Sequence, residues 1–140
     1  MKRTGSAVWN GEIKSGSGTV STESGVLDGV NYSFGKRFGD EKGTNPEELI
    51  GAAHAACFSM ALSGVLGSKG MTAEEIRTSA AVTVVPIEGG FEITRVDLTL
   101  RARIPGADEA SFREAAEAAK AGCPVSKVLN AEITLDAALD

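Results

Sequence analysis

The chain has 140 residues, of which 42% are hydrophobic and 24% are charged, a composition typical of one globular, soluble domain that we expect to span residues 1–140. Its formal net charge of −5 disfavours nucleic acid and anionic membrane surfaces as partners, because both attract basic patches. A small-molecule substrate agrees better with this balance of charge.

Residues Ala7 to Phe38 predict a meander of β-strands. Thr19–Thr22 are the β-rich centre of the second strand, and Leu27–Val30 carry a tight-turn signal. We expect an aromatic third strand that reaches Phe38, with the basic residues Lys36 and Arg37 near its end. Basic residues on an edge strand are usually solvated, so the local pattern alone gives Arg37 no function.

The segment Gly43–Lys69 predicts a long central helix. Thr44–Glu48 supply two candidate caps, a proline for the first turn and two glutamates that favour the positive end of the helix dipole. Because Leu49–Ser68 contain no charged residue, we expect neighbouring elements to bury this helix on all sides. Its many small residues make it less hydrophobic than we expect of a membrane span, and they imply a closely packed partner helix.

The residues from Ile76 to Ile104 predict a hairpin of two strands around Pro86–Gly90. In the second strand the apolar residues change parity near Thr94 and Arg95, which indicates a β-bulge.

The rest of the chain predicts two helices and a strand. Asp108–Ala121 are expected to form a helix that Gly122 ends in the C′ position. Pro124–Leu129 predict a short helix, and Ala131–Asp136 predict a last strand. Strands, helix, hairpin, helices and strand in this order indicate an α+β fold.

Two cysteines are the candidate reactive groups. No apolar run that resembles a signal segment follows Arg3, so we expect a cytoplasmic protein in which the cysteines serve catalysis or regulation. Cys57 lies inside the central helix, one turn after His54, where a lone cysteine is more often a core residue. Cys123 lies at the start of a helix, where amide N–H groups favour its thiolate, so it is expected to be the more acidic thiol.

Several chemistries are compatible with these residues. A zinc site of His54, Cys57 and Cys123 lacks paired ligand spacing. A hydrolase could use Cys57 with His54 as its base, although no Gly-rich oxyanion loop follows the cysteine. A redox-sensing module could use both thiols without turnover. No phosphate loop or dinucleotide fingerprint occurs among the scattered glycines.

Three runs of residues resemble a known family over nearly the full length of the chain. They are Gly18–Leu27, Gly43–Leu62 and Lys120–Asp136, and they are similar to the osmotically inducible protein C branch of the OsmC/Ohr hydroperoxide reductases. The related organic hydroperoxide resistance branch has a tyrosine where this chain has His54. The resemblance implies an α+β OsmC-like fold with antiparallel β-sheets around a long buried central helix, in an intertwined homodimer.

The resemblance also implies a role for each site residue. Cys57 is the peroxidatic cysteine and Cys123 the resolving one, while Arg37 stabilises the Cys57 thiolate and Glu47 holds the guanidinium. The substrate is an organic hydroperoxide, with hydrogen peroxide reduced more weakly, and a dithiol of lipoyl or another small type restores the thiols. No cofactor and no metal are implied. We expect the apolar side chains of Phe34, Phe38, Phe58 and Met60 to favour organic peroxides.

The central helix raises a question about how one site is assembled. A charge-free helix rich in small residues needs more cover than one chain of this size supplies, which predicts an obligate homodimer. On one straight helix Glu47 and Cys57 lie about 15 Å apart along the axis and cannot meet around one Arg37. Either the helix breaks, for example near Gly51, or the carboxylate comes from the partner chain.

Overall fold

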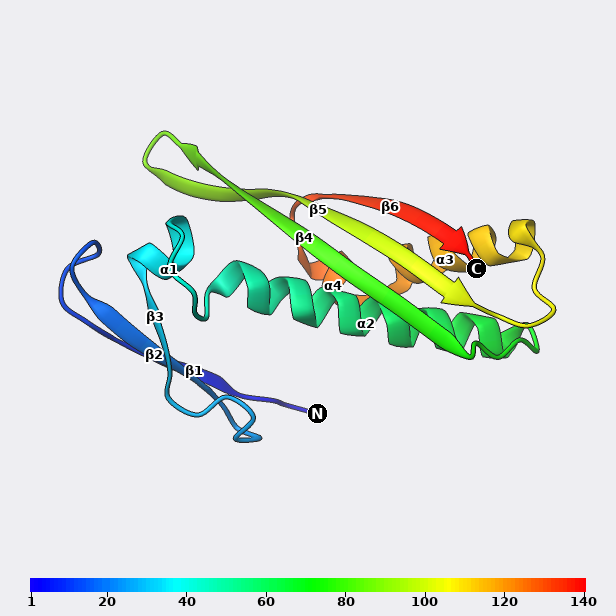
Figure 1. Ribbon diagram of the computed structural model, residues 1–140, viewed down its shortest axis with the longest axis horizontal. Coiled ribbons are helices and arrows are strands. Elements are labelled where there is room, and N and C mark those ends of the chain that lie inside the picture. The colour runs from blue at the N-terminus through cyan, green and yellow to red at the C-terminus, as the bar shows by residue number, and fades with distance from the viewer. The chain divides into compact units, whose positions relative to one another are not determined.

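The computed structural model describes residues 1–140, and the chain divides into two compact units, residues 1–49 and residues 50–140. Each unit is built on one three-stranded sheet (Figure 1). Sheets and helices occupy separate stretches of the chain, so the expected α+β class is confirmed. That the two units together make a single domain stays a prediction.

The first unit contains the expected meander. Strands β1 (Gly5–Asn10), β2 (Ser17–Thr22) and β3 (Val30–Ser33) pair in sequence order, and both pairs are antiparallel. The last turn before β3 contains Gly29 with φ of +62°, a left-handed conformation that glycine adopts without steric cost.

The expected third strand is too long, because β3 stops at Ser33. The residues that follow form a short helix, α1 (Phe34–Phe38), and Arg37 therefore lies on a helix and not on a strand. The reason is local capping: the Lys36 backbone N–H donates to Ser33 Oγ at 3.3 Å, which satisfies a donor at the start of the helix.

The second unit contains a long hairpin of β4 (Glu75–Ile87) and β5 (Gly90–Arg103). Thr83 pairs with Arg95 whereas Val84 pairs with Ile93, so Thr94 is the extra residue of a register shift. The predicted β-bulge is therefore confirmed at its predicted position.

The last strand, β6 (Glu132–Leu139), pairs with β5 in parallel. The expectation of purely antiparallel sheets is therefore wrong for this unit. Between β5 and β6 the chain passes through two helices, α3 (Glu109–Gly122) and α4 (Pro124–Val128). Such a crossover returns the chain to the end of the sheet where β5 began, which makes the new strand parallel.

The helix α2 (Pro46–Ser68) supplies one wall of the core of the second unit. Its start is capped as predicted, since the Glu48 backbone N–H donates to Asn45 Oδ1 at 2.8 Å. Within residues 50–140, α2 and α3 both pack against the sheet (Figure 1). The fully buried side chains of this core include Phe58, Leu62, Leu66, Val96, Leu98, Leu100 and Phe112.

One face of α2 is exposed in the single chain, so burial of the helix on all sides stays a prediction that depends on the predicted partner chain. Met60 is 80% exposed, and only 28% of the most apolar window of the helix is buried. The helix is also long enough to cross a membrane, and with a mean hydropathy of 1.7 in that window it is apolar enough, by length and composition. This value corrects the lower hydrophobicity that was expected from its small residues. Core helices of soluble proteins meet the same criteria.

The end of α3 also differs from its prediction. Gly122 is the last residue of the helix and has no positive φ, so it is not a left-handed C′ glycine. Cys123 instead caps α3 with φ of −60° and ψ of 124°, and it is also the N-cap of α4. Pro124 explains this geometry, because a proline disfavours the helical conformation of the residue before it.

Candidate active site

The structure brings the two cysteines together from distant parts of the chain. Cys57 lies in the middle of α2 and Cys123 lies between α3 and α4, and their Sγ atoms are 2.6 Å apart. Cys57 is partly exposed, Cys123 is fully buried, and both are free thiols. The two sulfurs are thus close to the S–S distance of a disulfide bond, about 2.05 Å.

The surroundings of the two sulfurs make the thiols unequal. Burial, followed by the hydrogen bond with Cys123, raises the pKa of Cys57, although the Val125 N–H opposes this shift. Burial alone would also raise the pKa of Cys123, but hydrogen bonds from Cys57 and from the backbone and side chain of Ser126 outweigh it and lower that pKa. Cys123 is therefore the more acidic thiol, as its place at a helix start predicts, and Cys57 needs a cation nearby to ionise near neutral pH.

His54 lies one turn before Cys57 on α2 and is fully buried. Its Nε2 atom is 2.8 Å from Ser126 Oγ, and its Nδ1 atom has no hydrogen-bond partner. Burial lowers the pKa of His54, so the imidazole is neutral at neutral pH. The histidine bonds Ser126 and not Cys57, so the base–nucleophile hydrogen bond of a Cys–His hydrolase is absent.

Ser126 was not among the residues that the sequence singled out. It belongs to the first turn of α4, three residues after Cys123. This spacing was a usable signal, because a side chain there can reach back to the N-cap residue.

No group of three or more His, Cys, Asp and Glu side chains could hold a metal ion. His54 Nε2 is directed at Ser126, so His54, Cys57 and Cys123 do not form the zinc site considered above.

In the first unit, Arg37 and Glu47 form a forked ion pair. Arg37 Nη2 and Nε donate to Glu47 Oε1 at 2.7 and 3.0 Å, and Nε lies 3.2 Å from Oε2. The Glu47 side chain is 10% exposed and that of Arg37 is 36% exposed. Arg37 Cζ also lies 4.9 Å from the ring centroid of Phe38, a cation–π contact. The guanidinium is therefore held in one orientation while part of it stays accessible.

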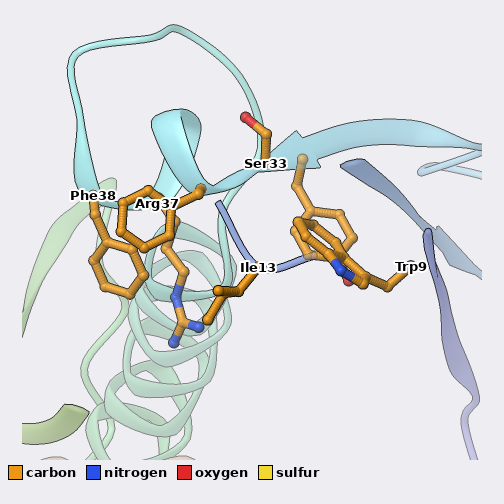
Figure 2. A pocket seen from close by; sticks show the side chains of 7 residues that line it. Trp9, Ile13, Ser33, Arg37 and Phe38 are labelled. Atoms are coloured by element: carbon orange, nitrogen blue, oxygen red, sulfur yellow. The ribbon is translucent and has the colours of Figure 1, made fainter. Parts of the chain in front are cut away.

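Beside Arg37 lies an apolar pocket of about 180 Å³ (Figure 2). It is lined by Trp9, Ile13, Tyr32, Ser33, Phe34, Arg37 and Phe38. Sequence reasoning named Phe34 and Phe38 as apolar neighbours of the site but missed the residues of β1, its following loop and β3. Of the other two apolar candidates, Phe58 is a core residue and Met60 is exposed on α2.

Two free thiols within covalent reach, at the junction of two helices, are the arrangement of a two-cysteine redox protein. The chain belongs to the OsmC-like protein family, whose model matches residues 39–138. The resemblance found in the sequence is therefore confirmed.

Curated relatives of this chain carry names from both branches of the family. The chain is 57% identical over 136 residues to peroxiredoxin OsmC of Escherichia coli (strain K12), with 97% of this chain and 95% of that protein covered. It is 34% identical over 96 residues to the organic hydroperoxide resistance protein of Xanthomonas axonopodis pv. citri (strain 306), with 66% of each chain covered.

Solved structures of the family have the same fold. An organic hydroperoxide resistance protein from Elizabethkingia anophelis matches with a TM-score of 0.73 and 29% identity, over 100% of this chain and 99% of that chain. OhrB of Bacillus subtilis matches with a TM-score of 0.70 and 26% identity, over 96% and 98% of the two chains.

Proposed function

We propose that this protein is a thiol-dependent peroxidase that reduces organic hydroperoxides to alcohols, and hydrogen peroxide more weakly, in oxidative or osmotic stress defence. The observation that carries the proposal is the 2.6 Å separation of the Cys57 and Cys123 sulfurs. The names of the relatives, peroxiredoxin and organic hydroperoxide resistance protein, support the same chemistry. The protein acts in the cytoplasm as one domain, without nucleic acid, membrane or resident cofactor.

The reaction proceeds by two displacements, the first at an oxygen of the peroxide and the second at the sulfur of Cys57. The Cys57 thiolate attacks the terminal oxygen of the hydroperoxide, the O–O bond breaks, and the leaving alkoxide takes a proton to become an alcohol. The Cys123 thiolate then attacks the Cys57 sulfenic acid, the S–O bond breaks, and water leaves as the disulfide forms. A dithiol reductant, of lipoyl or another small type, restores both thiols and becomes a disulfide itself.

Arg37 and Glu47 make the first displacement possible. A cation beside Cys57 favours the thiolate and offsets the burial that otherwise raises the pKa of this thiol. Glu47 orients the guanidinium through the forked pair, which leaves Arg37 N–H groups free to bind the peroxide. The aromatic pocket beside Arg37 takes the organic group of the substrate.

The functional unit is an intertwined homodimer. The exposed positions of α2 recur every three or four residues, so they share one face of the helix. This face consists of small residues and one methionine. Its members are Ala52, Ala53, Ala56, Met60, Ser63, Gly64 and Gly67. A partner chain that covers this stripe, hereafter the α2 stripe, removes apolar surface from water and allows two helices to approach closely.

Each active site draws on both chains of this dimer. The helix α2 runs unbroken from Pro46 to Ser68, which leaves the helix break near Gly51 without support. Ten residues of continuous helix separate Glu47 from Cys57 by about 15 Å along the axis. Arg37 and Glu47 of one chain therefore serve Cys57 of the other.

Peroxide turnover tests the proposed activity. Consumption of cumene or tert-butyl hydroperoxide is measured with dihydrolipoamide or dithiothreitol as the donor, and hydrogen peroxide serves as the comparison substrate. We expect sustained turnover and a higher kcat/KM for the organic peroxides. Oxidation that stops after one equivalent in the presence of excess dithiol would indicate a redox sensor and contradict the proposal.

Mixed dimers test the shared site. Glu47→Ala and Cys57→Ser chains are unfolded together, refolded, and separated from the parent dimers by affinity tags. We expect each mixed dimer to regain one complete site, because the intact Glu47 and Cys57 then come from different chains. Absence of recovered activity in verified mixed dimers would contradict the arrangement across two chains.

A further inference from the structure

The two cysteines lie on different elements of the second unit. Cys57 is in the middle of the long helix α2, whereas Cys123 lies at the junction of α3 with α4, a helix of five residues that has no buried residue. Cys123 makes no side-chain capping hydrogen bond at the start of α4. A helix of this length has little stability of its own. The position of Cys123 relative to Cys57 therefore depends on what holds this junction against α2.

Two hydrogen bonds between side chains join α2 to this junction. One is the contact between the two sulfurs at 2.6 Å, and the other joins His54 Nε2 to Ser126 Oγ at 2.8 Å. His54 lies one turn before Cys57 on α2, and Ser126 lies three residues after Cys123 on α4. The His54–Ser126 bond involves neither sulfur. It can therefore persist while Cys57 passes from thiol to sulfenic acid to disulfide, whereas the contact between the sulfurs changes at each step.

The burial of His54 indicates that the histidine serves this bond. Its side chain is fully buried, and its Nδ1 atom has no hydrogen-bond partner. An unmade hydrogen bond in such a place costs free energy that an apolar side chain would not lose. Packing alone therefore gives no reason for a histidine here, and the contact with Ser126 is the polar interaction that it makes.

This inference rests on the proposed function. We propose that His54 and Ser126 are positioning residues of the disulfide-forming step, and that their hydrogen bond holds Cys123 against Cys57 after the peroxide has oxidised Cys57. A group that is held in place reacts at a much higher effective concentration than one that must first be brought there. The His54–Ser126 bond therefore speeds formation of the disulfide and makes the disulfide harder to reduce.

The step needs no proton from either positioning residue. The Cys123 thiolate attacks the sulfur of the Cys57 sulfenic acid, and the S–S bond forms as the S–O bond breaks. The Cys123 sulfur is oxidised and the Cys57 sulfur is reduced. The proton that Cys123 has lost ends on the departing hydroxide, which leaves as water. His54 and Ser126 keep their protonation states throughout.

Single-turnover kinetics test the effect on rate. The reduced protein is mixed with one equivalent of cumene hydroperoxide, quenched at increasing times, and analysed by intact mass for the sulfenic acid and the disulfide. In Ser126→Ala and in His54→Leu we expect disulfide formation to slow by about tenfold relative to Cys57 oxidation. Because both substitutions break the same bond, the double variant should be no slower than the slower single variant. Ser126→Thr, which keeps the hydroxyl, should restore the rate.

Ser59→Ala is the matched control. Ser59 also lies on α2, and its part-buried hydroxyl donates to Thr78 Oγ1 of β4 at the same distance of 2.8 Å. This substitution removes a bond of the same kind, but the bond joins α2 to the sheet and not to the junction that carries Cys123. We expect disulfide formation in Ser59→Ala to keep the wild-type rate. Equal slowing in Ser59→Ala and Ser126→Ala would show a general loss of stability and refute the proposal.

The reduction potential gives a readout that does not depend on peroxide. Each protein is equilibrated with mixtures of reduced and oxidised dithiothreitol, and the fraction of disulfide is measured by intact mass after alkylation. In Ser126→Ala we expect the equilibrium constant for disulfide formation to fall by about tenfold, which corresponds to a potential about 30 mV less negative. Ser59→Ala should keep the wild-type potential.

The outcomes distinguish this proposal from the proposed function. Wild-type protein that does not oxidise Cys57 at all would refute the peroxidase, and the reduction potentials would still test the His54–Ser126 bond. Normal Cys57 oxidation in Ser126→Ala, with disulfide formation and a potential equal to those of the wild type, would refute the positioning role alone. Should His54→Leu fail to fold by circular dichroism, Ser126→Ala and Ser126→Thr still decide the question.

Discussion

At the scale of single residues, the proposed chemistry depends on how one cation, Arg37, is held. Three hydrogen bonds connect Arg37 to a nearly buried Glu47, and the guanidinium also lies over the Phe38 ring. These contacts fix the plane of the guanidinium and leave its charge uncompensated by any further acid. A point charge of the same sign cannot reproduce this geometry.

Arg37→Lys should therefore impair the enzyme although it keeps the charge. The lysine ammonium cannot bond both Glu47 oxygens and bind a peroxide in a fixed direction, so we expect kcat/KM for cumene hydroperoxide to fall by about ten- to a hundredfold. Stopped-flow measurement of Cys57 oxidation checks this. Lys36→Arg on the same helix is the matched control and should leave the rate unchanged. An Arg37→Lys rate equal to that of the wild type would contradict the role given to the fork.

The site residues were predicted from family resemblance and not from local pattern, and their roles stay predictions. Arg37 by itself reads as a solvated surface residue, and Cys57 as a core residue. The position of Ser126 in the first turn of α4 was a usable signal, but its contact with His54 could not be predicted, because it joins two helices far apart in the chain. The pocket residues Trp9 and Tyr32 were missed for the same reason. They lie on β1 and β3, on either side of β2, and only the sheet brings their rings to 5.3 Å from each other.

At the scale of elements, α2 and β4 come unusually close at Gly51. A Cβ atom added there would lie 2.8 Å from the Ala80 carbonyl oxygen, which is backbone and cannot move away cheaply. Only glycine permits this approach. The position therefore sets the distance between the helix that carries Cys57 and its sheet.

Gly51→Ala should destabilise the protein although alanine is the better helix former. We expect the free energy of unfolding to fall by about 1 to 3 kcal/mol, because overpacking outweighs the gain in helix propensity. Gly122→Ala on α3 is the control, since a Cβ atom there meets nothing within 4 Å. Urea denaturation measures both variants. A Gly51→Ala protein as stable as Gly122→Ala would show that the helix can move from the sheet freely.

The N-cap of α3 predicts how the stability of the protein changes at low pH. The Ser111 backbone N–H and hydroxyl donate to Asp108 at 2.9 and 2.7 Å and lower the pKa of this carboxyl below its ordinary 3.8. The cap therefore contributes fully above the unfolded pKa and is lost as pH falls through the lower folded value. Asp108→Asn keeps the cap but does not titrate.

We therefore expect wild type to lose more stability than Asp108→Asn between neutral pH and about pH 3. Urea midpoints at the two pH values check this. Equal losses in both proteins would mean that the charged cap makes no contribution.

Capping, periodicity and parity predicted most elements, because these signals are local. The start of α2 and the bulge at Thr94 are examples. The helix α1 was missed because an aromatic run after a strand looks like more strand, and the cap at Ser33 decided otherwise. The parallel direction of β6 was missed because strand direction depends on the path of the crossover, which the residues of the strand do not encode.

At the scale of the whole molecule, we propose that a partner chain covers the α2 stripe. Met60→Glu places a charge in the centre of that stripe, and we expect the dimer to dissociate, because a buried unpaired charge is costly. Light scattering should then report a mass near 14.4 kDa instead of twice that value. Ala110→Glu adds the same charge at an exposed position of α3 and should leave the dimer intact. A Met60→Glu dimer of wild-type stability would contradict the predicted interface.

The central claim is the order in which the two cysteines react. Thiol acidity and the proposed mechanism point to different cysteines as the first to react. The local surroundings make Cys123 the more acidic thiol, whereas the proposed mechanism has Cys57 attack first with help from Arg37. Intact mass after one equivalent of cumene hydroperoxide, measured on Cys57→Ser and Cys123→Ser, decides between them. We predict that Cys123→Ser gains one oxygen atom as a sulfenic acid and that Cys57→Ser does not react. Rapid oxidation of Cys57→Ser, with Cys123→Ser left unmodified, would contradict the mechanism.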